Sequence, residues 1–155
     1  MGRPNLLYLH THDLGRYCQP YGYASATPNV QQVAEDGVLF RQAFAAAPTC
    51  SPARAALLTG KYPHSCGMLG LVNRGFSLAD AGQHIVHTLR KAGYHSALIG
   101  TQHVLPDASE IGYDEVNTCG KQGRCGPAAE WLAGAPPQPF FLSVGFNDTH
   151  RTFPA

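Results

Sequence analysis

Residues 84–100, HIVHTLRKAGYHSALIG, contain a helix pattern followed directly by a strand pattern, and this order decides the fold class. The first part places isoleucine, valine and leucine on one side of a helix over 84–92, and Gly93 ends that helix. Residues 94–100 are then predicted to form a short strand. A helix that leads into a strand is typical of α/β folds with a parallel sheet.

The same alternation continues on both sides of this stretch. Two apolar runs, 5–11 and 140–146, predict buried strands. A third, 38–40, predicts a short extended segment. Three more helices are predicted from their start and stop residues: 29–36, 52–58 and 128–133. Together these elements predict a parallel sheet with helices on both faces.

Polar side chains follow the predicted strands at the point where each strand ends. His12 and Asp13 follow the first strand, His103 follows the middle one, and His150 follows the last. Because open α/β sheets bind ligands outside the carboxyl ends of their strands, we expect these side chains to converge on one site.

Cys50 lies where the 52–58 helix is about to begin, and Arg54 follows one turn later. Unpaired backbone N–H groups and the helix dipole favour an anion at such a position, and a guanidinium adds positive charge. The pair therefore predicts a site for an oxyanion such as sulfate or phosphate. A small buried cysteine beside a solvated arginine is the alternative that the local pattern leaves open.

Residues 50–64, CSPARAALLTGKYPH, resemble the signature of the type I sulfatases in the alkaline phosphatase superfamily. Within that family, the chain is most similar in character to the heparan N-sulfatase (sulfamidase) branch and its bacterial relatives. Further similar segments extend over most of the chain: 27–29, 67–68, 92–94, 99–100 and 140–151. The resemblance implies an α/β fold, the parallel-sheet three-layer sandwich of that superfamily, incomplete in this chain. Residues 1–155 would form the amino-terminal part of a single sulfatase catalytic domain.

In this family the pattern Cys-x-Pro-x-Arg is read by a formylglycine-generating enzyme, which oxidises the cysteine. The resemblance implies that Cys50 becomes formylglycine, whose hydrated aldehyde attacks sulfur with one hydroxyl and expels sulfate with the other. Arg54 would neutralise negative charge on the reacting groups, and His103 matches the histidine of the family's Gly-Lys-x-His segment. His150 would contact the sulfate or the leaving-group oxygen and act as general acid.

The resemblance also implies one divalent cation, with Ca²⁺ expected because the family's ligands are oxygen atoms. Asp13 matches the second of two aspartates that end the family's first strand, His12 stands in place of the first, and modified Cys50 is a further ligand. An imidazole at this position shifts the preference toward softer metals. Thr101 replaces the family's lysine, which removes one positive charge near the sulfate.

Composition limits the partners. Charged residues make up 14% of the chain with a net charge of +1, so no nucleic acid is expected as a partner. No apolar run approaches the length of a membrane span, no membrane partner is expected, and no secretory signal follows the first residues, which predicts a cytoplasmic protein. Two of the five cysteines, Cys119 and Cys125, are expected to be free loop thiols.

The expected substrate is a small-molecule or saccharide sulfate ester, or a sulfamate, and the expected modifying partner is the formylglycine-generating enzyme. Because family members are much longer and this chain is low in charge, a missing carboxy-terminal half or an oligomer partner is also expected. Three other functions remain open: a phosphodiester or phosphonate monoester hydrolase, a non-catalytic anion-binding remnant, and a cysteine hydrolase that pairs the Cys50 thiolate with His150 or His103.

Overall fold

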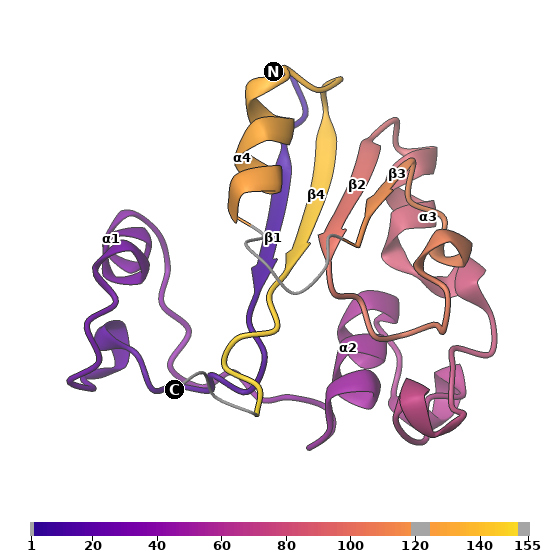
Figure 1. Ribbon diagram of the computed structural model, residues 1–155, viewed down its shortest axis with the longest axis horizontal. Helices are drawn as coiled ribbons and strands as arrows, with labels where there is room; N and C mark the ends of the chain where they lie inside the picture. Colours follow the sequence, from indigo (N-terminus) through magenta and orange to yellow (C-terminus); the bar gives the residue numbers. More distant parts are fainter. Residues whose placement is uncertain (1, 119–124, 152–155) are drawn as a thin grey trace.

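The computed structural model describes residues 2–118 and 125–151. Within these ranges, strands form one parallel sheet in the order β1-β4-β2-β3: β1 Leu6–His10, β2 His95–Gly100, β3 Glu115–Asn117 and β4 Phe140–Gly145 (Figure 1). The α-helices are α1 Pro28–Asp36, α2 Cys50–Thr59, α3 Ile85–Lys91 and α4 Cys125–Ala133. Short 3-10 turns lie at Gln19–Tyr21, Pro63–Cys66, Val72–Arg74, Ala81–Gln83 and Ala108–Ile111.

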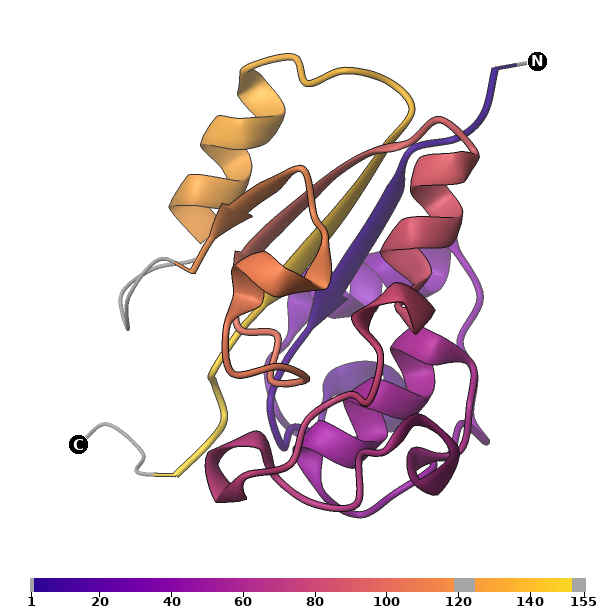
Figure 2. The ribbon, with the colours of Figure 1, turned by 90° about the vertical axis from the view of Figure 1, so that its right-hand side faces the viewer.

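The two central strands are covered on both faces, because their alternate side chains enter two separate cores. On one face, Leu98 of β2 and Phe141 of β4 pack with residues of α2 and α3, among them Ala55 and Val86. On the other face, the alternate side chains pack with α4: Ala97, Ile99, Leu142 and Val144 against Ala128 and Trp131. Figure 2 shows α3 and α4 on opposite sides of the sheet. The predicted parallel sheet with helices on both faces is confirmed.

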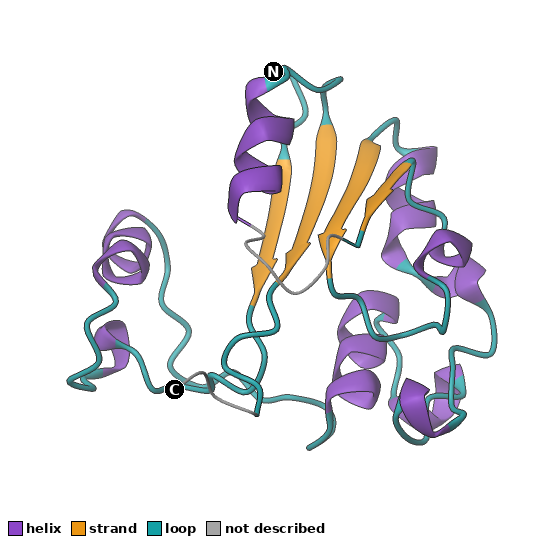
Figure 3. Cartoon of the chain, viewed as in Figure 1, coloured by secondary structure: helices purple, strands orange, loops and turns teal. Residues whose placement is uncertain are grey.

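The carboxyl ends of β1, β4 and β2 lie together at one end of the sheet, where loops follow each strand (Figure 3). Gly145 of β4 lies between His10 of β1 and Gly100 of β2. Thr101 N donates to Gly145 O at 3.0 Å, and Phe146 N donates to His10 O at 2.9 Å, so the pairing continues into the loops. The first residues beyond β2 and β4 are therefore held against the ends of the neighbouring strands.

Most element predictions are confirmed, with shifts at the ends. The prediction that the first strand is buried on both faces is wrong: Leu7 and Leu9 of β1 are 51% and 58% exposed, because the core packs against the other face of this strand only. α2 begins at Cys50 rather than at Pro52, because proline is tolerated in the first turn of a helix, where its missing N–H has no partner to lose. Gly60, with φ of 66°, ends α2 by donating its N–H to Ala56 O. None of the helices that the structure describes is long and apolar enough to cross a membrane.

The expected extended segment at 38–40 does not join the sheet. Val38 and Phe40 are 78% and 70% exposed, so no apolar burial offsets the cost of ordering them as a strand. Conversely, β3 was not predicted, since its three residues EVN form no apolar run and all are exposed. It is held in place by the preceding Asp114, whose carboxylate accepts hydrogen bonds from Ser96 N and Ser96 Oγ at the start of β2.

Candidate active site

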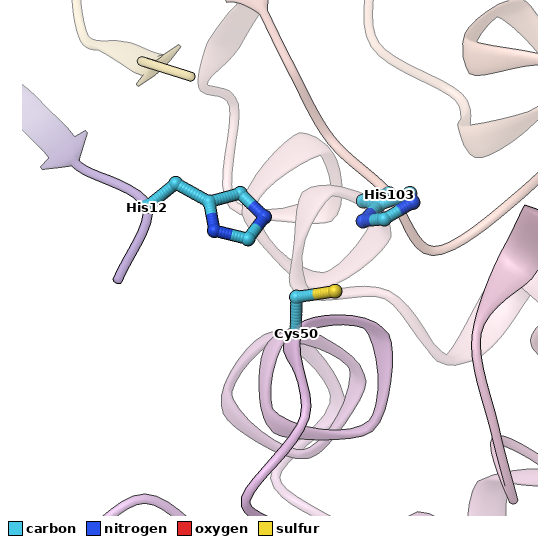
Figure 4. Close-up of side chains that lie close together, drawn as sticks. All are labelled: His12, Cys50 and His103. Carbon is cyan, nitrogen blue, oxygen red and sulfur yellow. The ribbon is translucent and has the colours of Figure 1, made fainter. Parts of the chain in front are cut away.

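Three segments that are distant in the sequence bring His12, Cys50 and His103 together (Figure 4). His12 lies in the loop after β1, Cys50 is the first residue of α2, and His103 lies in the loop after β2. Cys50 Sγ and one ring nitrogen from each histidine all lie within 4.8 Å of one another. The structure thus brings together three of the side chains that the sequence placed in one site.

His150 and Asp13 join the same cluster from its other side. The rings of His150 and His12 are 4.4 Å apart at 90°, and a ligand atom from each of His12, Asp13 and His150 lies within 4.8 Å of the other two. The loops after β1 and β4 are joined by His12 N donating to Asp148 O at 2.8 Å and Thr149 N donating to His12 O at 2.7 Å. Backbone pairing therefore fixes the relative positions of His12 and His150.

The amino terminus of α2 opens onto a cavity of about 1230 Å³. Thr49, the residue before Cys50, makes no side-chain capping hydrogen bond, so the first N–H groups of α2 are left to other partners. Arg54 and Lys61 also line the cavity, and both carry positive charge. The helix end and these two cations make the cavity suited to an anion.

Arg54 is almost fully buried, with 8% of its surface exposed. Burial lowers the pKa of its guanidinium, which nevertheless stays charged at neutral pH. Its Nη1 lies 2.7 Å from His10 Nδ1, and no Asp or Glu of the described residues forms an ion pair with it. The charge of Arg54 is therefore not neutralised by a carboxylate in this part of the chain.

His10 is a residue of the site that the sequence analysis missed. It was counted only as part of the first strand, although an imidazole two positions after Tyr8 lies on the same inner face of β1. Burial, followed by the nearby charges of Arg54 and His12, lowers the pKa of His10 to about 3, so its ring is neutral at neutral pH. This period-two spacing at a strand end was the signal that could have revealed it.

Two of the site residues have strained backbones. Asp13 and His103 have φ of 58° and 65°, and the only other described non-glycine residue with positive φ is Ala135. Such strain persists where surrounding contacts enforce it, and it concentrates at functional sites. At His103 the enforcing contacts come from Gln102, whose Oε1 accepts from Val104 N and Leu105 N. Gln102 is a second residue that the sequence analysis missed.

The donors of this cluster fit a divalent cation. Nδ1 of His103 is buried and has no hydrogen-bond partner among the described residues. Nδ1 of His12 is likewise buried without hydrogen-bond geometry to any partner, although Asp13 Oδ1 lies 3.0 Å away. Burial lowers the pKa of both histidines, so at neutral pH each keeps a lone pair for a metal. The residues present therefore fit a divalent cation, and their nitrogen atoms suit a softer metal than Ca²⁺.

The remaining histidines lie outside the cluster and make packing contacts. His64 stacks on Tyr62, and His87 is bonded to Ile111 O. His95 pairs with Glu115, and buried His84 accepts a hydrogen bond from the N–H of Val86 at the start of α3: both contacts lie away from the cavity. Cys18, Cys50, Cys66 and Cys125 are free thiols, and Cys125 begins α4. Cys119, also expected to be free, lies outside the described residues.

Comparison with known proteins gives one family. The sequence profile of the family described as Sulfatase matches residues 4–123. An ulvan-active sulfatase of Formosa agariphila is 31% identical over 97% of this chain and 26% of its own length. The human N-sulphoglucosamine sulphohydrolase is 35% identical over 95% of this chain and 32% of its own length. The chain therefore spans only about a quarter to a third of these curated relatives.

Solved structures agree on the fold. A 2-O GAG sulfatase matches 96% of this chain and 35% of its own, with a TM-score of 0.73 at 22% identity. The phosphonate monoester hydrolase of Agrobacterium radiobacter matches 96% of this chain and 41% of its own, with a TM-score of 0.72 at 22% identity. The expected alkaline phosphatase-type fold is confirmed, with a part of it present in this chain.

Proposed function

The chain belongs to the sulfatase family, and on that premise we propose that it carries the nucleophile and the anion-binding groups of a sulfate ester or sulfamate hydrolase. One observation carries this proposal. Cys50, at the amino terminus of α2, lies against His12 and His103 with all three ligand atoms within 4.8 Å, and buried Arg54 follows one turn later.

Cys50 is proposed as the site of formylglycine, formed by a formylglycine-generating enzyme. When present, the hydrated aldehyde supplies one hydroxyl to attack sulfur and a second whose collapse to the aldehyde releases sulfate. The chain's own contribution is to hold the sulfate group. Arg54 donates to its oxygens from a buried position, where a charge is screened less than in water, and the first N–H groups of α2 add further donors.

The proton needed by the leaving group is proposed to come from His150. Hydrolysis breaks the S–O or S–N bond and consumes one water, and the departing oxygen or nitrogen must gain a proton. His150 is exposed and lies next to His12, so a leaving group can reach it from solvent. Burial lowers the pKa of His103, so its ring is neutral at neutral pH and little of it is in the imidazolium form that would give up a proton. We assign His103 to holding the cation or a sulfate oxygen.

A divalent cation is proposed to bind at His12, which belongs to two groups of ligand atoms that lie within 4.8 Å of one another. Residue 50 and His103 complete one group, and Asp13 and His150 complete the other, so the predicted set of His12, Asp13 and Cys50 is divided between them. The cation would supply positive charge to the reacting oxygens. Ca²⁺ is the cation that the family resemblance favours. However, His12 adds a nitrogen donor, which suits Zn²⁺ or Mn²⁺ better than a purely oxygen-binding ion. Parallel titrations with Ca²⁺ and Zn²⁺ test the identity.

The substrate is proposed to be a sulfated saccharide. The relatives in Formosa agariphila and human are named for ulvan and for N-sulphoglucosamine, which both point to this class. The phosphonate monoester hydrolase shares the fold, so a phosphorus substrate is the competing possibility.

The test compares turnover of an aryl sulfate with turnover of an aryl phosphodiester, using the whole protein that contains this chain, produced together with a formylglycine-generating enzyme. The proposal expects the sulfate to be hydrolysed faster, and it expects Cys50→Ala to abolish both activities. Faster turnover of the phosphodiester would support the competing function. Turnover of neither substrate by the whole protein with formylglycine at position 50 would contradict both.

A further inference from the structure

The last residue of β1 makes a contact that the proposed chemistry does not yet use. The side chains of Leu6, Tyr8 and His10 lie on the inner face of the strand, whereas Leu9 on the outer face is 58% exposed. Leu6 and Tyr8 pack against the core shared with α2 and α3, so His10 extends that face to the strand end. There Arg54 Nη1 lies 2.7 Å from His10 Nδ1 and 3.4 Å from its Nε2.

The ring of His10 is confined on two sides. Tyr8 stacks on it with ring centroids 4.8 Å apart and planes inclined by 26°. Gly145 lies opposite His10 in the β1–β4 pairing, and a Cβ at Gly145 would come within 2.7 Å of the ring carbon Cε1 and 2.8 Å of Nε2. The ring therefore fits only because position 145 has no side chain, and strand pairing fixes where its acceptor nitrogen lies.

A buried guanidinium needs acceptors, because taking its donors out of water without partners is costly. A guanidinium has donors only, so His10 accepts from Arg54 through an unprotonated ring nitrogen. A carboxylate would satisfy the same donor but would also cancel the positive charge. A neutral imidazole satisfies the donor and leaves the charge of Arg54 available to an incoming anion.

We propose that His10 is a positioning residue, which holds Arg54 at the cavity as an uncharged acceptor so that its full charge acts on the bound sulfate group. This inference rests on the proposed function in taking sulfate as the anion. A role in packing alone would be served equally well by a carboxylate, which can also anchor Arg54. The charge of residue 10 therefore separates the two roles.

The experiment titrates inorganic sulfate into the chain and follows the Arg54 side-chain Nε–H signal by ¹⁵N NMR. His10→Asn keeps an acceptor near the place of Nδ1, and its sulfate affinity should stay within about twofold of wild type. His10→Leu removes the acceptor and His10→Asp neutralises Arg54, and each should weaken sulfate binding about tenfold or more, as expected for a charge-assisted hydrogen bond. Leu9→Asp, with the same carboxylate on the outer face, is the matched control and should change affinity by less than about twofold.

The inference would be overturned if His10→Asp or His10→Leu bound sulfate with the affinity of wild type. It would also be overturned if the wild-type chain bound no sulfate. If one of these variants fails to fold, the other against His10→Asn still decides. Sulfate binding needs neither formylglycine nor turnover. A chain that binds sulfate in the expected order but hydrolyses no sulfate ester would overturn only the proposed function. A chain that hydrolyses the ester while His10→Asp binds sulfate normally would overturn only the role of His10.

Discussion

Replacing Gly145 by alanine should damage both the sheet and the site. A Cβ at this position would lie 2.0 Å from the backbone oxygen of Thr101 and 2.7 Å from Cε1 of His10, both well inside normal contact distance. The oxygen belongs to the backbone just beyond β2, and the ring is stacked on Tyr8, so neither neighbour can move alone. Overpacking of this kind costs about 1 to 3 kcal/mol, and we expect Gly145→Ala to lose about 3 kcal/mol, the upper end, because one neighbour is backbone.

Urea unfolding followed by circular dichroism measures this loss, and Gly126→Ala in α4 is the matched control. A Cβ at Gly126 meets nothing within 4 Å, and Gly126 is the second residue of α4, where alanine is tolerated, so this variant should be about as stable as wild type. Gly145→Ala should also weaken sulfate binding, because His10 must shift away from Arg54. A Gly145→Ala protein with the unfolding free energy and sulfate affinity of wild type would refute this reasoning.

Three further predictions concern the nucleophile, a buried histidine and the metal. Cys50→Ala should abolish hydrolysis of aryl sulfate, yet change the unfolding free energy by less than about 1 kcal/mol in urea melts. Burial lowers the pKa of His84 to about 4, so the unfolded chain binds a proton that the folded chain refuses between pH 6.5 and 4. The contribution of neutral His84 to the unfolding free energy is fully present above pH 6.5. It is lost as the pH falls toward 4, by up to about 1.4 kcal/mol per pH unit. His84→Asn keeps an acceptor for the N–H of Val86 without this titration, and a pH series of unfolding curves should show a shallower loss; an unchanged slope would count against the assignment. A divalent cation present at a concentration of about a hundred times its Kd should raise the unfolding free energy by about 2.7 kcal/mol. His12→Ala should remove this effect, whereas His87→Ala, outside the cluster, should retain it.

The sequence predicts the sheet because β4 is a nearly continuous apolar run and β2 follows directly on a helix that ends at Gly93, and the structure buries both strands. It does not predict β3, whose three exposed residues gain their position from Asp114 and Ser96, a contact between side chains that no periodicity reveals. The extended segment predicted at 38–40 joins no strand, because a short apolar run does not distinguish a buried strand from an exposed loop until its neighbours are known.

The candidate site likewise has residues that the sequence predicts and one that it does not. Cys50 and Arg54 are apparent from a local motif, and His12, His103 and His150 from their places after strands. The contact of His10 with Arg54 joins residues 44 positions apart and depends on a glycine in a third segment. Such a contact follows from strand register and helix packing together, and neither is written in any one stretch of sequence.

The proposed hydrolysis of sulfate esters depends on residue 50 acting as formylglycine. Mass spectrometry of the peptide that spans Cys50, from chain produced together with a formylglycine-generating enzyme, measures this conversion. We expect a lower peptide mass, as an aldehyde replaces the thiol, and no such conversion in a Cys50→Ala chain. A peptide that keeps the mass of the unmodified thiol under these conditions would rule out formylglycine as the nucleophile.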